Sequence, residues 1–126
     1  MIKFDEMDKN IKLKDQLEEK ITGSVILINK FNVDPDGVDQ LLEAWASDAA
    51  FFKQQPGFIS TQMHRGIGKS SVFINYAVWE STDLYKNAIN KYLSPETQSQ
   101  LVKYPDSAVG TPHLFKKIAV PGLCVD

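Results

Sequence analysis

The chain has 126 residues, of which 43% are hydrophobic and 24% charged, and its formal net charge is −2 at pH 7. These values predict one globular domain with a single core and argue against general disorder. They also provide no electrostatic attraction for nucleic acid or for an anionic membrane, so we expect neither as a partner. The lone cysteine, Cys124, excludes an internal disulfide. Because no apolar run is long enough for a signal peptide or a membrane span, the expected location is the cytoplasm.

The chain divides into a charged N-terminal arm and one domain. Residues 1–22 are dense in charged side chains, and their few apolar residues are irregularly spaced. We expect this arm to be partly helical and to lie on the domain body or on a partner chain. Residues 23–126 contain no repeat, low-complexity segment or internal boundary, and we predict one folded domain there.

The first strand is predicted at residues 24–33. One face of it is apolar except for a single amide: Val25, Leu27, Asn29, Phe31 and Val33. Ile26 and Ile28 lie on the other face, and apolar residues on both faces indicate a central strand.

A helix follows, starting at Asp34-Pro35, where Asp is a common N-cap and Pro suits the first helical position. It ends at Gln55-Pro56-Gly57. The apolar residues recur at helical spacing and form one stripe: Val38, Leu41, Leu42, Trp45, Ala49 and Phe52.

A hairpin is predicted next, with strands at 58–65 and 70–79 around a four-residue loop, Gly66–Lys69. An even loop of this length places His64 on the same face as Asn75, whereas a slip of one residue reverses this. Ser81 is expected to cap a second helix, and Ser94-Pro95 starts a short helical piece. The last strand is predicted at residues 113–120.

The order strand, helix, strand, strand, helix, strand predicts an α+β, ferredoxin-like βαββαβ fold. Its four-stranded antiparallel sheet carries two helices on one face. The other face has apolar residues too, including Ile26, Ile28 and Ile74, and a second copy of the sheet is the simplest cover. We therefore expect a homodimer, with the two sheets packed as an α+β barrel.

Polar residues within apolar strands are the first candidates for a site, because a buried amide costs free energy unless it is paired. Asn29 and Asn75 are such residues. Trp79 shares a face with Asn75 and lies roughly 13 Å further along the strand. This separation suits the two ends of a polycyclic ligand.

The strings PGFISTQMHRG and FINYAVWES, preceded by VILINKFNV, resemble the antibiotic biosynthesis monooxygenase superfamily of dimeric α+β barrels. The resemblance extends from about residue 24 to the terminal HLFKKIAVPG. Within the superfamily, the anthrone-oxidising monooxygenases of aromatic polyketide pathways are the nearest characterised comparison. The resemblance implies an oxidoreductase that uses molecular oxygen, needs no metal or organic cofactor, and acts on an electron-rich aromatic, anthrone or quinol-like substrate.

Matched residue by residue, the resemblance implies four catalytic positions: His64, Asn75, Trp79 and Tyr85. An oxyanion of the substrate would accept hydrogen bonds from Asn75 and Trp79, while His64 would accept the proton. A second set is expected to bind the substrate: Asn29, Phe31, Trp45 and Phe73.

The family's catalytic arginine has no counterpart, because residues 94–107 contain Lys103 but no arginine. A non-catalytic ligand-binding or stress-response dimer with the same fold therefore stays open. Haem degradation is the reaction of another branch of the superfamily. Asn29 matches the strand asparagine of that branch and favours this reaction. The Trp and the iron-binding His of that branch fall on Ala88 and near Gln98 here, which disfavours it. Two histidines and one cysteine at scattered positions predict no metal site.

Overall fold

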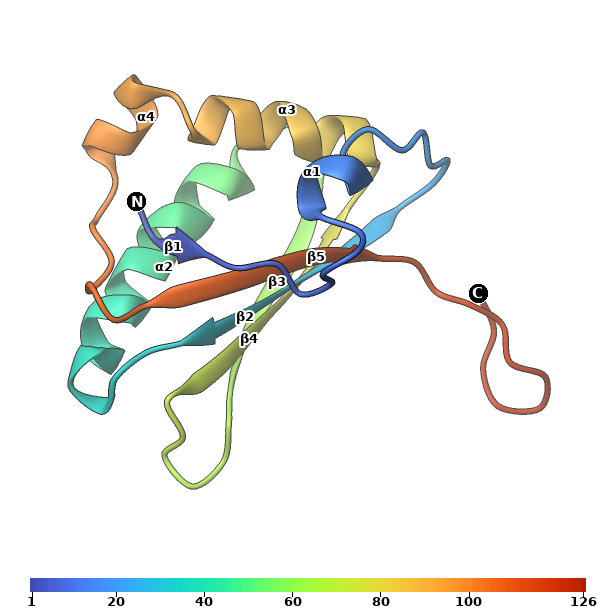
Figure 1. The fold of residues 1–126 in the computed structure, drawn as a ribbon. Helices are drawn as coiled ribbons and strands as arrows, with labels where there is room; N and C mark the ends of the chain where they lie inside the picture. The colour runs from blue at the N-terminus through green and yellow to red at the C-terminus, as the bar shows by residue number, and fades with distance from the viewer.

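The computed structural model describes all 126 residues and consists of one twisted sheet with its helices on one face (Figure 1). In chain order the elements are β1 (Lys3–Phe4), α1 (Leu13–Gln16), β2 (Val25–Asn32), the 3-10 turn η1 (Pro35–Gly37), α2 (Val38–Lys53), β3 (Phe58–Arg65), β4 (Val72–Trp79), α3 (Thr82–Tyr92), α4 (Pro95–Gln100) and β5 (Val109–Phe115). None of the helices combines the length and apolarity needed to cross a bilayer.

The sheet has five strands in the order β1-β5-β2-β4-β3, and it is mixed. The four strands β5-β2-β4-β3 pair antiparallel and form the predicted ferredoxin-like core. The expectation of a strictly four-stranded antiparallel sheet is wrong, because β1 pairs parallel to β5 at the edge. The irregular apolar spacing of residues 1–22 concealed this two-residue strand.

β2 is central, as its apolar residues on both faces indicate. It pairs with β4 along its whole length and with β5 from Ile26 to Asn32, so its backbone groups have partner strands on both sides over that stretch. Val25, Leu27 and Phe31 are buried toward the helices, while Ile26 and Ile28 on the other face are half-buried. This alternation determines which face of the sheet packs on the helices.

The helices are capped largely as predicted. The Leu84 N–H donates to Ser81 Oγ at 3.1 Å at the start of α3, and the Thr97 N–H donates to Ser94 Oγ at 3.3 Å at the start of α4. Asp34 makes no side-chain cap; its own N–H donates to Ser107 Oγ at 3.1 Å instead.

The N-terminal segment covers the edge of β5. After β1 the side chain of Gln16 continues the pairing, since its Oε1 accepts from the Leu114 N–H at 2.9 Å and its Nε2 donates to the Leu114 carbonyl at 2.9 Å. Ile2 is buried in the core cluster around Phe31, whereas Leu13 and Leu17 pack against a second core cluster around Leu27. An otherwise open strand edge is thereby protected.

The last strand ends earlier than predicted, at Phe115. Phe115 pairs with Ile26, and β2 begins one residue before Ile26, so residues beyond Phe115 have no partner strand. Residues 116–126 are exposed and project away from the body (Figure 1).

We expect Gly57→Ala to destabilise the protein by about 2–4 kcal/mol. Gly57 has φ +91°, and a Cβ there would lie 2.5 Å from Leu84 Cβ, so backbone strain and a steric clash add together. The matched control is Gly68→Ala, which has φ +74° but open space around it, and it should cost only about 1 kcal/mol. Urea unfolding measures both, and equal losses would contradict the packing of α3 on this turn.

Candidate functional site

A cavity of about 380 Å³ lies between the inner face of the sheet and the helices. It is lined by 26 residues, 18 of them hydrophobic. β2, β3 and β4 form its floor, α2 and α3 form its roof, and the N-terminal segment contributes a side wall through residues such as Phe4, Leu13 and Leu17. An apolar chamber of this size with a few polar groups is typical of a small-molecule site.

Six of the eight residues predicted from the sequence line this cavity: Asn29, Phe31, Trp45, Asn75, Trp79 and Tyr85. Two do not, namely His64 and Phe73. The six come from β2, α2, β4 and α3, so only the tertiary structure brings them together.

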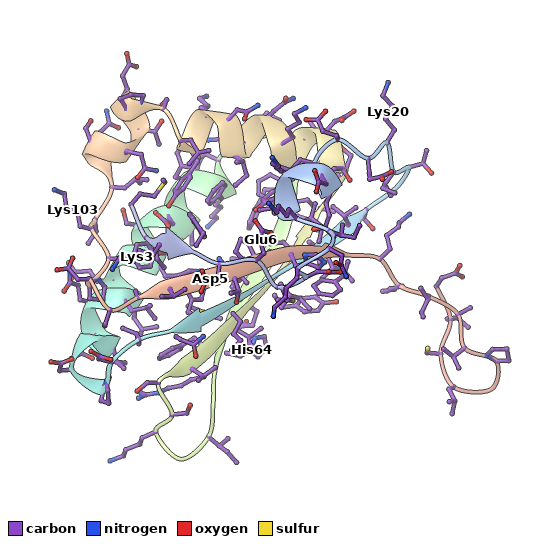
Figure 2. The ribbon with its side chains drawn as sticks, viewed as in Figure 1. Lys3, Asp5, Glu6, Lys20, His64 and Lys103 are labelled. Atoms are coloured by element: carbon purple, nitrogen blue, oxygen red, sulfur yellow. The ribbon has the colours of Figure 1, made fainter.

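His64 lies on the opposite face of the sheet. It pairs with Ile74, whereas Met63 pairs with Asn75, so the expectation that His64 shares a face with Asn75 is wrong. Arg65 pairs with Phe73, so residues 66–72 connect the two strands. This connection has an odd number of residues, whereas the prediction assumed an even one. This register turns the His64 side chain away from the helices (Figure 2), where it is exposed and contacts the Ile74 carbonyl at 3.2 Å.

Phe73 is directed inward but packs in the core and is not part of the cavity lining. It is 1% exposed and belongs to the cluster around Phe31 and Leu41. The Arg65 guanidinium lies 5.3 Å from its ring centroid, a cation–π contact. The expectation that Phe73 forms a wall of the site is therefore wrong, and the chain's one arginine is used at the hairpin.

Asn29 and Asn75 form an amide pair on the cavity floor. They are directly opposite each other in the register of β2 and β4. The Asn75 Oδ1 accepts a 2.5 Å hydrogen bond from the Thr61 hydroxyl, which leaves its Nδ2 as the group available to a ligand. The Asn29 Oδ1 is buried and has no hydrogen-bond partner. A buried group left in this state costs roughly 1–3 kcal/mol.

Trp79 stands at the other end of the same strand face, within a group of aromatic rings. It is 1% exposed and meets the rings of Phe52 and Phe58 edge-on, at 6.0 and 5.5 Å between centroids. The ring of Tyr85 lies 5.2 Å away, and burial raises the pKa of its hydroxyl. Tyr85 therefore keeps its proton at neutral pH and can act as a hydrogen-bond donor.

Asp48 is a cavity residue that the sequence analysis missed. It lies on α2, is 8% exposed, and accepts hydrogen bonds on Oδ2 from the hydroxyls of Tyr92 at 2.9 Å and Tyr104 at 2.8 Å. Burial raises the pKa of its carboxyl to about 6, although the two tyrosine hydrogen bonds act in the opposite direction. Burial, and after it the proximity of Asp48, raises the pKa of both tyrosines.

A signal for Asp48 was present in the sequence. It lies three residues after Trp45 and four before Phe52, so it occupies the apolar stripe of the helix. A carboxylate in such a stripe requires partners, which Tyr92 and Tyr104 supply from distant parts of the chain.

No group of three or more His, Cys, Asp or Glu residues is arranged to hold a metal ion. Cys124 is free and exposed in the C-terminal segment.

Comparison with known proteins agrees with this geometry. A family model described as antibiotic biosynthesis monooxygenase matches residues 24–100, more than half of the chain. Deoxynogalonate monooxygenase of Streptomyces nogalater is 34% identical over 65 residues, which are 52% of this chain and 54% of that enzyme. The match thus spans about half the length of that relative.

Solved structures share the fold. A proposed monooxygenase from Shewanella loihica PV-4 superposes with a TM-score of 0.68 at 29% identity, over 79% of this chain and 99% of that one. SnoaB, a cofactor-independent oxygenase from Streptomyces nogalater, superposes with a TM-score of 0.61 at 24% identity, over 80% and 99% of the two chains. The chain belongs to the antibiotic biosynthesis monooxygenase family and has its ferredoxin-like α+β fold.

Proposed function

We propose that this protein is a cofactor-independent monooxygenase that oxidises an electron-rich aromatic, of the anthrone or quinol type, with molecular oxygen. The observation that carries the proposal is the amide pair of Asn29 and Asn75, which lie directly opposite each other in the lining of an apolar cavity. Such an arrangement binds a flat apolar molecule that carries a polar or anionic oxygen.

The chemistry explains why these groups suit the reaction. Triplet oxygen reacts slowly with closed-shell organic molecules, so without a metal or flavin the substrate must supply the electron as an enolate or phenolate. A water-poor site with fixed donors stabilises that anion. The Asn75 amide nitrogen and the Trp79 indole N–H are donors positioned on one strand face, and Tyr85 adds a hydroxyl.

The relatives support this proposal at the level of reaction class. One is named a deoxynogalonate monooxygenase and another is described as a cofactor-independent oxygenase. The substrate is proposed only as a class, because the first match covers about half of that enzyme.

Replacing Asn75 by Ala should lower kcat/KM for oxygen uptake by about 10²-fold, the usual loss on removing one oxyanion donor. The measurement is oxygen consumption, with no added cofactor, in a screen of anthrones and quinols. Asn87→Ala, an exposed amide on α3, is the matched control and should have wild-type activity.

Trp79→Phe should also lose activity, since it removes the indole N–H but retains an aromatic ring. Unchanged rates in both site variants would reject the assigned site. A wild-type protein that binds these aromatics without consuming oxygen would instead indicate the ligand-binding alternative.

We also infer that the outer face of the sheet pairs with a second copy of the chain. All helices lie on the opposite face (Figure 1), and the outer face presents apolar side chains without cover. Ile74, Tyr76 and Phe115 are 40%, 39% and 37% exposed. A contiguous apolar surface on a sheet is typical of a subunit interface, and a self-complementary pairing is the simplest one.

The double variant Ile74→Lys with Tyr76→Lys should convert the dimer into a monomer, because it places like charges in an apolar interface. Sedimentation should give about 28.4 kDa (2 × 14.2 kDa) for the wild type and 14.2 kDa for the variant. Ile67→Lys, at a hairpin tip that is 98% exposed, is the control and should remain dimeric. A wild-type protein that stays at 14.2 kDa at micromolar concentration would refute the dimer.

A further inference from the structure

Asp48 has a position in the cavity that hydrophobic packing does not explain. It is an acidic residue, 8% exposed, within a chamber whose lining is mostly apolar. Both tyrosine hydroxyls bind one of its oxygens, Oδ2, and no protein group hydrogen-bonds to the other, Oδ1. Two donors therefore hold the carboxylate in one orientation while its second oxygen keeps free lone pairs.

Asp48 also lies between two cavities. The second, of about 260 Å³, is lined by residues of α4 and the segment after it, including Gln98, Ser99 and Lys103. Asp48, Tyr92 and Tyr104 line both cavities. A proton taken up on the main-cavity side thus has a polar space beyond the carboxylate through which it can leave.

We infer that the Asp48 carboxylate is the proton acceptor of the main cavity, with Tyr92 and Tyr104 as its positioning residues. This inference rests on the proposed oxygenase function, and it supplies the base that His64, on the other face of the sheet, cannot provide from within one chain. The substrate it implies carries an acidic C–H or O–H group, as an anthrone methylene does.

The proton steps balance for oxidation of such a methylene to a carbonyl. Asp48 removes one C–H proton, the carbanion adds oxygen to form a peroxide anion, and Asp48 returns the proton to give the hydroperoxide. Asp48 then removes the second C–H proton as the O–O bond breaks. The departing hydroxide takes this proton from Asp48 and becomes water. The carbon loses four electrons and the two oxygen atoms gain four, so one oxygen atom becomes the carbonyl and the other becomes water.

The electrostatic surroundings agree with this role. Burial raises the pKa of Asp48 to about 6, so the carboxylate form predominates at neutral pH and still binds a proton readily. Tyr92 from α3 and Tyr104 from the segment before β5 face it, as does the α-amino group of Met1. The other charged groups lining the two cavities are Asp5, Glu6, Lys14 and Lys103, all exposed.

The test is hydrogen–deuterium exchange at the methylene of anthrone, followed by mass spectrometry in D₂O without oxygen. This measures proton abstraction alone. Wild-type protein should accelerate exchange over buffer, with a rate that rises as pH increases through about 6. Asp48→Asn should lose at least 10²-fold of that acceleration, the usual contribution of a general base.

Controls separate catalysis from structure. Asn retains an acceptor for both tyrosine hydroxyls, so the urea midpoint of Asp48→Asn checks that the fold is intact. The control variant is Asp39→Asn, which changes an exposed carboxyl on the same helix. It should accelerate exchange at the anthrone methylene as much as the wild type does. Tyr104→Phe removes a hydrogen bond that lowers the Asp48 pKa, so it should move the midpoint of the pH profile upward.

The outcomes distinguish the two proposals. Exchange that depends on Asp48, in a protein that consumes no oxygen, would support the base and reject the oxygenation. Two results would overturn the assignment of Asp48. In the first, folded Asp48→Asn exchanges the methylene within about threefold of the wild-type rate. In the second, the wild-type protein exchanges it no faster than buffer.

Discussion

The antiparallel pairing of β2 with β4 is the constraint on which the cavity depends. It places Asn29 directly opposite Asn75 on the face that carries Val25, Leu27, Ala77 and Trp79. Because side chains alternate along a strand, a shift of either strand by one residue would turn its amide to the outer face and separate the pair. Burial of the apolar residues on the same face resists such a shift, so core packing also positions the polar groups.

The polar groups in the cavity reduce stability in the empty protein. The Asn29 carbonyl oxygen has no partner, and the Asp48 carboxylate is removed from water. Each such group costs of the order of 1–3 kcal/mol, against a total stability of about 5–15 kcal/mol for an ordinary domain. A core designed for stability alone would place apolar residues there, which is why these two positions direct attention to a ligand.

The N-terminal segment links the fold to the cavity. The Gln16 side chain hydrogen-bonds to the backbone of β5 and so holds the segment in place. Within the segment, Glu6 accepts a 2.8 Å hydrogen bond from the Leu13 N–H. Asp5 and Glu6 lie beside β5 (Figure 2), and their segment borders the cavity. A stretch that looks like a charged surface arm thus forms a wall of the chamber, because a few apolar residues suffice to cover a small opening.

Alternation and capping signals allowed the sequence by itself to determine the ferredoxin-like order, the inward face of β2 and β4, and the starts of α3 and α4. Each of these depends on residues close together in the chain. The positions of Asn29, Asn75 and Trp79 follow from the same local pattern. The hairpin register that separates His64 from Asn75 does not, because it depends on the turn conformation. Likewise, only the tertiary structure decided that Tyr92 and Tyr104 meet Asp48, since these contacts join residues 44 and 56 positions apart, and short-range patterns carry no information about them.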